Sequence, residues 1–445
     1  MKFKFFSFAL MALAMSFTFS ACGDDDKNDK KDSGDVEVPS GDDDKPVEEA
    51  LVISSKEQKE VLEQTAMNLL DKINADDFKP LTDLVEYYNE NIARKRRYNY
   101  NTYRYEYTGI DTEAMEQWFE TAVKACEGEM SNNVQRNLYI AANFKGRFVA
   151  GKTEWEYKGA SDGLEFQFTD QNGKICVLKI TASDDYTKVH IAELDNTRWE
   201  WDGNNQIQRR YEYVVAVPKT VGVTFTQGST SLASAKVTTN LSISGADVDL
   251  TKDSYELTAN IEACGYQIVV DKVQYTQGQK AYASTKVLKN GETLITLKAE
   301  ANGKVQMDKN KVQLREAGRV AFNADVLGKV QAIGEIKSVD KATNFIEAAS
   351  DAESDEERQT AVDNVNDQLN IGLYYDGKST RQAYVKFNLT SYRNKSGEEY
   401  YKLAPAIFFS DDTSYSFDEY FDKTYFKTVI DKFNYLISDF EDLVD

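Results

Sequence analysis

Two tryptophans separated by a single residue are candidates for binding a carbohydrate. Trp199 and Trp201 lie in the sequence Arg-Trp-Glu-Trp-Asp, and alternate side chains of a β-strand project from the same face. Two neighbouring indoles on one face can stack on sugar rings, whose C–H faces are apolar. The alternative is burial in the core of a β-sandwich, because tryptophan buries a large area. The lack of any other sugar-binding motif favours that alternative.

A basic and aromatic segment is the second candidate. Residues 93–107 read Ala-Arg-Lys-Arg-Arg-Tyr-Asn-Tyr-Asn-Thr-Tyr-Arg-Tyr-Glu-Tyr. Such side chains can stack on sugars or bases and hold anions, and an acidic glycan suits them better than nucleic acid. The favoured alternative is an extended segment whose tyrosines cover the neighbouring helices. The candidate ligand-binding residues of this segment are Arg96, Arg97, Tyr103 and Tyr105.

No arrangement of residues in the sequence is typical of catalysis, of a metal site or of a cofactor site. The single histidine, His190, has no Gly-x-Ser-x-Gly motif beside it, and we expect a strand residue with a hydrogen-bond partner. Zinc-ligand spacings, a phosphate loop and a dinucleotide fingerprint are missing, and residues 247–253 lack the Gly and Glu of a calcium loop. Any chain this acidic offers carboxylate pairs, so glycoside hydrolysis ranks last. We therefore expect a protein without enzymatic activity, cofactor or metal.

The acidic composition limits the classes of partner. The formal net charge is −21, which repels the phosphates of nucleic acid and opposes binding to anionic lipid head groups. Of the four cysteines, three remain if Cys22 is modified, and an odd number does not predict a disulfide framework. We expect Cys126 and Cys176 to be small buried side chains.

The first 22 residues resemble the signal of a bacterial lipoprotein. Two lysines precede an apolar run, residues 5–19, that is too short to cross a membrane. Residues 19–22, Phe-Ser-Ala-Cys, resemble a lipobox, with Phe19 where leucine is usual. The resemblance implies a diacylglycerol on Cys22, attachment to a membrane and removal of residues 1–21. The alternative is an ordinary signal peptide cleaved near Ser20, with Cys22 a free thiol.

An acidic stretch follows the modified cysteine. Residues 23–49 contain 12 acidic residues and 4 lysines, and no apolar periodicity. Such a segment cannot bury enough surface to fold, so residues 22–49 are expected to be a disordered tether. The aspartates directly after Cys22 resemble the surface-export signal of Bacteroidota lipoproteins. This resemblance implies an outer-membrane location facing the cell exterior, and a spacer without a sorting role is the alternative.

The remaining chain predicts an α+β protein in three parts. Residues 50–145 show the 3.6-residue period of helices, and from residue 146 the period changes to two. We expect an N-terminal helical unit (50–145), a central antiparallel β region (146–336) and a C-terminal α/β segment (337–445) that ends in a long amphipathic helix. The predicted helices cover residues 54–74, 81–92, 112–126, 340–350, 354–369 and 417–443.

The β region contains an internal duplication. Residues 223–228 recur as 273–278, and residues 233–237 recur as 283–287, with a constant offset of 50 residues. This predicts two copies of one unit, near 221–240 and 271–290, each consisting of a strand, a glycine turn and a returning strand. Two copies are too few for a solenoid, so we expect duplicated hairpins in one large sheet.

We expect a cell-surface lipoprotein that binds a ligand without catalysis, with a glycan as the favoured ligand. One alternative is a carrier of lipid or another apolar ligand. For that alternative, residues 210–445 show a loose architectural similarity to lipid-binding folds of the bactericidal/permeability-increasing type, a likeness of fold alone. The other alternative is a structural or adhesive surface protein.

Overall fold

The computed structural model describes most of the chain from residue 53 onward. The expected signal peptide (1–21), Cys22 and the tether (22–49) lie outside the described residues, as does Cys126, so the statements about them remain predictions. The described part combines N-terminal helices with a large antiparallel sheet, which confirms the α+β prediction. The described residues are 53–125, 127–131, 134–140, 143–191, 194–245, 249, 251–308, 311–376, 380–393, 399–421 and 426–442.

The chain forms two compact units. The first unit comprises Met1–Ala75 and Val270–Asp445, and the second unit comprises Asp76–Val269. The predicted boundaries at residues 145 and 336 followed changes in sequence periodicity, whereas this division follows contacts between residues far apart in the chain. A short 3-10 helix, η2 (Ala75–Phe78), lies where the chain passes from one unit to the other.

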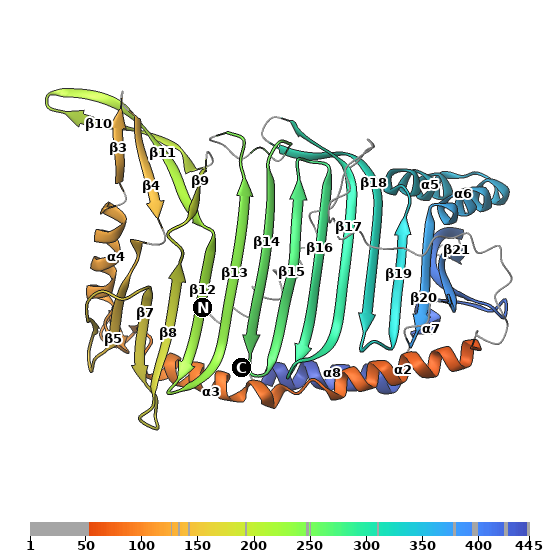
Figure 1. The fold of residues 1–445 in the computed structure, drawn as a ribbon, viewed down its shortest axis with the longest axis horizontal. Coiled ribbons are helices and arrows are strands. Elements are labelled where there is room, and N and C mark those ends of the chain that lie inside the picture. Colours follow the sequence, from red (N-terminus) through yellow and green to blue (C-terminus); the bar gives the residue numbers. More distant parts are fainter. Residues whose placement is uncertain are drawn as a thin grey trace. The chain divides into compact units, whose positions relative to one another are not determined.

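The second unit is built mainly of strands. Its main sheet has the order β14-β13-β12-β8-β7-β5-β6, a smaller sheet has the order β10-β11-β4-β3 with β9 also paired to β11, and β1 pairs with β2 (Figure 1). The elements are α3 (Lys79–Asn91), β1 (Lys95–Asn99), β2 (Arg104–Thr108), α4 (Glu113–Ala125), β3 (Glu127–Ser131), β4 (Val134–Ile140), β5 (Gly146–Ala150), β6 (Trp155–Tyr157), β7 (Leu164–Thr169), β8 (Ile175–Ala182), β9 (Tyr186–His190), β10 (Asn196–Asp202), β11 (Asn205–Pro218), β12 (Thr220–Gln227), β13 (Thr230–Ser242) and β14 (Ser254–Ala263).

The core of the second unit is aromatic. Phe148 on β5 is fully buried, and its ring contacts those of four neighbours at centroid distances of 5.3–6.2 Å. Cys176 on β8 is also fully buried, and burial, reinforced by the charge of Asp170, raises the pKa of its thiol to about 11. Cys176 is therefore a small core side chain, as predicted. The four neighbours of Phe148 are Trp118, Phe119, Tyr157 and Phe166.

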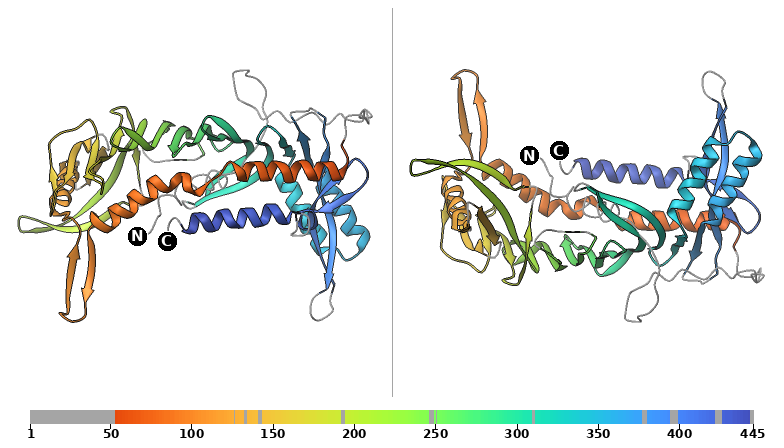
Figure 2. Two further views of the ribbon diagram at one scale, coloured as in Figure 1. Left: turned by 90° about the horizontal axis from the view of Figure 1, so that it is seen from below. Right: turned by 90° about the horizontal axis from the view of Figure 1, so that it is seen from above.

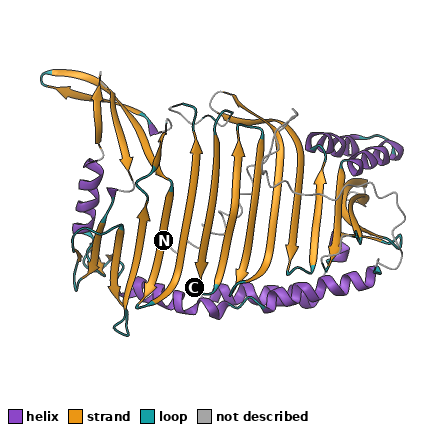
Figure 3. Cartoon of the chain, in the orientation of Figure 1, coloured by secondary structure: helices purple, strands orange, loops and turns teal. Residues whose placement is uncertain are grey.

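The first unit joins N-terminal and C-terminal segments around one sheet. Its strands follow the order β23-β22-β21-β20-β19-β18-β17-β16-β15, in which β15 continues from the second unit. Figure 3 shows its strands side by side and its helices α5 and α6 packed on each other. The elements are α2 (Ser55–Asp71), β15 (Tyr266–Thr276), β16 (Lys280–Lys289), β17 (Glu292–Asp308), β18 (Lys311–Val326), β19 (Val330–Ile336), α5 (Val339–Asp351), α6 (Asp355–Asp367), β20 (Leu369–Tyr375), β21 (Ala383–Arg393), β22 (Glu399–Phe409), β23 (Ser414–Ser416), α7 (Phe417–Tyr420) and α8 (Lys427–Asp442).

Helix α2 is held to the C-terminal half of the first unit by buried amides. The side chain of Gln58 donates hydrogen bonds of 3.0 Å to the carbonyls of Ile53 and Gln382, and Gln382 accepts from the N–H of Ile53 at 3.0 Å. Helices α2 and α8 lie side by side (Figure 2). These contacts explain why the first helix belongs with residues more than 300 positions away.

The C-terminal helical region is shorter than predicted. The chain leaves the helical conformation at Phe421 (φ −103°, ψ 21°), so α7 ends at Tyr420, and α8 begins at Lys427. Tyr420 and Phe426 instead place their aromatic rings in the core of the first unit, 5.8 Å apart. The aromatic spacing in the sequence is thus explained partly by core packing and partly by one amphipathic helix.

Both copies of the duplicated unit form the predicted strand, turn and strand. In the first copy β12 pairs with β13, with Val223 opposite Ala235, and Gly228 in the turn has a φ of 58°. In the second copy β15 and β16 are neighbours, and their turn contains Gln277 (φ 44°) and Gly278 (φ 69°). The left-handed backbone explains why glycine recurs at this point in both copies.

Candidate functional site

A β-hairpin extends from the small sheet of the second unit and carries the tryptophan pair. β10 runs antiparallel to residues 205–211 of β11, whereas β4 and β9 pair with β11 only from Arg210 onward. The hairpin closes through Gly203-Asn204, and Gly203 has a left-handed φ of 60°. Residues 196–211 therefore form an arm that reaches beyond β3, β4 and β9 (Figure 1).

Both tryptophans of the arm are exposed. The exposed fraction is 63% for Trp199 and 72% for Trp201. Among the described residues, neither ring contacts another aromatic ring, and neither side chain has a hydrogen-bond partner. The interpretation of this pair as sheet core is therefore wrong, because both side chains are exposed and residues 205–209 of β11 pair, among the described strands, with β10 alone.

The tryptophans belong to one continuous exposed face of the arm. Trp199 is opposite Gln208 and Trp201 is opposite Gln206, and residues paired across an antiparallel ladder share a face. Successive side chains on one strand face are about 6.8 Å apart. The result is a block of two indoles and two amides, which we name the Trp face. Thr197 and Arg210 complete it, and all six side chains are exposed.

On the opposite face of the arm, the side chains contact one another. Arg209 forms an ion pair of 2.8 Å with Glu200, and the hydroxyl of Tyr211 donates to the same carboxylate. The guanidinium of Arg198 lies 5.0 Å from the ring centre of Tyr211. Charged residues on an edge strand also hinder pairing with the strands of other molecules. The arm is thus stabilised from one face while the Trp face remains open.

An ionic cluster fixes the base of the arm. Asp195 Oδ1 lies 3.0 Å from Nε2 of His190 and accepts from the backbone N–H of Tyr213 at 3.3 Å. Its other oxygen accepts from Nη2 of Arg210 at 3.0 Å. Burial opposes ionisation, but these hydrogen bonds outweigh it and hold the pKa of Asp195 below its usual value near 3.8. His190 is a strand residue with a hydrogen-bond partner, as predicted.

Replacing Asp195 with asparagine should lower the free energy of unfolding at pH 7 by about 1–3 kcal/mol, because Arg210 loses the nearer of its two carboxylate partners and keeps Glu212 at 3.7 Å. A carboxyl group whose pKa is lowered by folding adds stability above its unfolded pKa, near 3.8, and loses it as the pH falls through the folded pKa. The difference between the two proteins that comes from the Asp195 carboxyl should shrink as the pH falls below about 4. Urea unfolding across this range measures it.

The matched control for Asp195 is Asp184→Asn. Asp184 also forms an ion pair, with Lys145 at 3.2 Å, but its side chain is 84% exposed. We expect that substitution to change the free energy of unfolding by less than about 0.5 kcal/mol. Equal effects of the two substitutions at pH 7 would contradict the role given to Asp195.

The basic and aromatic segment forms a second, separate hairpin. β1 and β2 pair only with each other among the described residues, in a register that places Arg96 opposite Tyr107 and Tyr98 opposite Tyr105. Figure 2 shows this hairpin, in orange, projecting away from the other elements of the second unit. We name residues 94–108 the Tyr/Arg hairpin. The interpretation that its tyrosines cover helices is wrong, because Tyr100, Tyr103, Tyr105 and Tyr107 are all exposed.

A glycine closes the base of the Tyr/Arg hairpin. Gly109 has a φ of 83°, and a Cβ atom there would lie 2.1 Å from the carbonyl oxygen of Ala93. Only glycine allows the two ends of the hairpin to approach so closely. Arg94 is tied to the same region by an ion pair of 2.7 Å with Asp111. A close backbone contact and an ion pair therefore fix the base of the Tyr/Arg hairpin.

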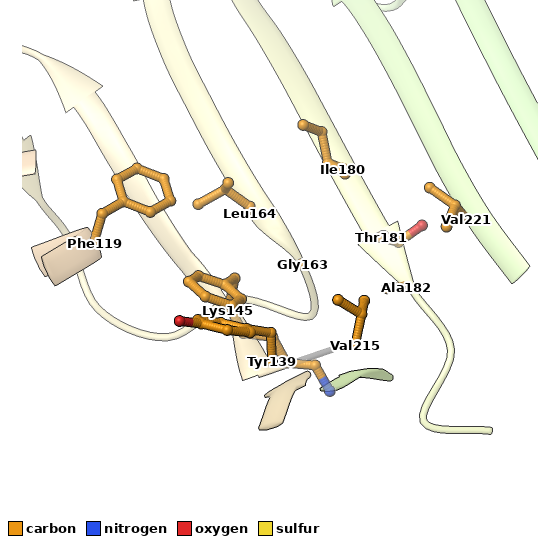
Figure 4. A pocket seen from close by; sticks show the side chains of 11 residues that line it. Phe119, Tyr139, Lys145, Gly163, Leu164, Ile180, Thr181, Ala182, Val215 and Val221 are labelled. Atoms are coloured by element: carbon orange, nitrogen blue, oxygen red, sulfur yellow. The ribbon is translucent and has the colours of Figure 1, made fainter. Parts of the chain in front are cut away.

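An apolar cavity lies inside the second unit, apart from both hairpins in sequence. Its volume is about 350 Å³, within the lower range of small-molecule pockets. Figure 4 shows Phe119, Leu164 and Val215 around the space, with Lys145 beside Tyr139. Its lining residues are Phe119, Tyr139, Phe144, Lys145, Gly163, Leu164, Ile180, Thr181, Ala182, Val215 and Val221.

The structure separates the candidate residues into two groups. Trp199 and Trp201 lie together on the arm, while Arg96, Arg97, Tyr103 and Tyr105 lie on the Tyr/Arg hairpin, in a different sheet. The two glutamines of the Trp face, Gln206 and Gln208, are not among the residues predicted from the sequence. The turn at residues 202–205 could have revealed them, because hairpin pairing across it places Gln206 opposite Trp201. No local sequence pattern indicates the cavity, because its lining residues come from six separate elements and the segments between them.

Comparison with known proteins gives no family assignment. The chain matches no protein-family model, no curated protein and no solved structure. Within the described ranges, no group of three or more His, Cys, Asp or Glu side chains is arranged to hold a metal ion. In the same part of the chain, every helix is too short or too polar to cross a lipid bilayer.

Proposed function

We propose that this protein is a cell-surface lipoprotein, anchored through Cys22, that binds an uncharged carbohydrate on the Trp face. The observation that carries the proposal is the exposure of Trp199 and Trp201 on one face of a projecting arm. Contiguous exposed apolar surface marks an interaction site more often than chance. The acidic tether after Cys22 supports a position in which the arm can reach an extracellular ligand.

The chemistry of the Trp face favours sugars over other ligands. Indole rings stack on the apolar C–H faces of sugar rings, and the amides of Gln206 and Gln208 can both donate to and accept from hydroxyl groups. The one charged side chain of this face, Arg210, is already paired with Asp195. A face of two rings, two amides and no uncompensated charge fits a neutral glycan. A specific protein–protein interface usually needs a larger apolar area than the Trp face offers.

A glycan array tests this proposal directly. The chain from residue 50 onward should bind a subset of neutral oligosaccharides, and the variant Trp199→Ala/Trp201→Ala should lose those signals. Tyr435→Ala is the control, because Tyr435 lies on α8 in the first unit and is 72% exposed, as Trp201 is. Binding that survives in the tryptophan variant, or an array without neutral hits, would overturn the proposal.

A second candidate function is the binding of a small apolar ligand in the cavity of the second unit. The observation that favours it is the apolar lining, with the Lys145 ammonium group as the one charged side chain among the lining residues. Lys145 also pairs with Asp184 at 3.2 Å. Such a site suits a short acyl chain with an anionic head group, since burial of each CH₂ contributes about 0.8 kcal/mol.

Native mass spectrometry after purification tests the second function. We expect the wild-type chain to bind added decanoate, and Ile180→Trp, which fills the cavity, to bind it at least about 10-fold more weakly. Ile175→Trp on the same strand is the control, because Ile175 is exposed. Equal binding by all three proteins would count against the cavity as the site.

A further inference from the structure

The Tyr/Arg hairpin has two chemically different faces. Alternation along its strands places cross-strand partners on the same face. Among the paired residues, one face carries Arg96, Tyr98, Tyr105 and Tyr107, and the other carries Lys95, Arg97 and Arg104 with a single acidic residue, Glu106. The first face offers ring surfaces, and the second offers positive charge.

Four of the five basic residues of the hairpin have no ion-pair partner among the described residues. Arg94 pairs with Asp111, whereas the side chains of Lys95, Arg96, Arg97 and Arg104 form no ion pair there. Opposite Arg97, Glu106 accepts a hydrogen bond of 2.5 Å from Asn99. Unpaired cations gathered on one hairpin are unexpected in a chain of net charge −21, and they create a local attraction for anions.

Stacking on tyrosine rings orients the arginines of the aromatic face, and it leaves Arg96 free to meet an anion because only Arg94 is ion-paired. The guanidinium of Arg96 lies 3.5 Å from the ring centre of Tyr105, and that of Arg94 lies 4.7 Å from the ring centre of Tyr107. A stacked guanidinium keeps its N–H edge directed sideways, where it can form two parallel hydrogen bonds to a carboxylate or sulfate. Stacking also reduces the freedom that Arg96 would lose on binding.

At the tip of the hairpin, Tyr103 has an unfavourable backbone conformation. Tyr103 has a left-handed φ of 55° and is 78% exposed. A left-handed conformation is unfavourable for a residue with a Cβ atom, and glycine or asparagine would relieve it. The neighbouring turn is ordered by Asn99, whose Oδ1 accepts from the backbone N–H groups of Asn101 and Thr102. The ring of Tyr103 is therefore largely exposed beside an ordered turn.

We propose that the Tyr/Arg hairpin binds an acidic polysaccharide, with its tyrosines stacking on sugar rings and its unpaired cations holding carboxylate or sulfate groups. This site is independent of the Trp face and extends the proposed function from neutral to charged glycans. A membrane surface fits less well, because residues 94–108 contain no Leu, Ile, Val, Met, Phe or Trp to enter the lipid. Nucleic acid also fits less well, because the chain as a whole is strongly acidic and duplex DNA carries one charge per about 1.7 Å.

Isothermal titration with polygalacturonate tests the proposal, with uncharged dextran as the matched polymer. The variant Arg96→Gln/Arg97→Gln/Arg104→Gln should bind polygalacturonate about 10- to 100-fold more weakly than the wild type. The same substitutions to lysine should cause a smaller loss, because the charge stays and the planar donors are lost. The charge-matched control is Lys152→Gln/Lys174→Gln/Lys236→Gln, at three exposed positions of the second unit, and it should bind like the wild type.

The outcome of this experiment is separable from that of the Trp-face test. Trp199→Ala/Trp201→Ala should keep its full affinity for polygalacturonate, and the arginine variant should keep the neutral-glycan signals. Equal polygalacturonate affinities of the arginine variant and the wild type would overturn the proposal. So would tighter binding to single-stranded DNA than to polygalacturonate, or binding only to vesicles that contain phosphatidylglycerol.

Discussion

Replacing Phe148 with alanine is expected to lower the free energy of unfolding of the second unit by about 3–5 kcal/mol. Phe148 is fully buried, and its ring contacts four other aromatic rings contributed by α4, β6 and β7. Truncation removes the transfer free energy of the ring and leaves a cavity that those neighbours cannot close. The loss is a large part of the roughly 5–15 kcal/mol by which a domain is stable. Urea unfolding followed by tryptophan fluorescence reports it, because Trp118 and Trp155 lie in this core.

The matched control for Phe148 is Phe433→Ala on α8. Phe433 is 50% exposed, so the same chemical change should cost less than about 1 kcal/mol. Phe148→Leu should fall between the two, since it retains part of the apolar volume. If Phe148→Ala and Phe433→Ala unfold at the same urea concentration as the wild type, the packing described for the second unit is contradicted.

Removing both rings of the Trp face is expected to weaken binding of a neutral glycan by roughly 25- to 900-fold. Aromatic contacts contribute about 0.5–1.5 kcal/mol beyond the area they bury, and with that area each tryptophan should account for about 1–2 kcal/mol, or roughly 5- to 30-fold in affinity. Because Trp199 and Trp201 would contact the same ligand, the double substitution need not equal the sum of the single ones. Titration calorimetry with the best oligosaccharide from the array measures the effect.

Phenylalanine variants make this prediction sharper. Trp199→Phe/Trp201→Phe keeps a flat apolar ring at each position but reduces its area, so we expect part of the affinity to remain. Gln206→Ala/Gln208→Ala should weaken binding less than loss of the rings, because exposed neutral hydrogen bonds contribute about 0.5–1.5 kcal/mol each. A glutamine variant that loses more affinity than the tryptophan variant would show that hydrogen bonding, not stacking, dominates on this face.

The local structure of the chain could be predicted from the sequence because local interactions decide it. Ser54 with Glu57, and Ser354 with Glu357, form capping boxes at the starts of α2 and α6, and the partners in each box are only three residues apart. Pro80 lies in the first turn of α3, where its missing N–H has no helical partner to lose. The duplicated strand and turn pattern was equally visible, because its glycines lie where the backbone is left-handed.

Exposure and long-range pairing were decided only by the tertiary structure. An alternating pattern shows that Trp199 and Trp201 share a face, but it does not show whether that face is covered. Whether the face is covered depends on where the pairing of β4 with β11 ends. That parallel pairing joins segments 76 residues apart. For the same reason the tyrosines of residues 98–107 could not be placed from the sequence. Whether these side chains form core or binding surface depends on contacts between distant segments, which residue spacing does not encode.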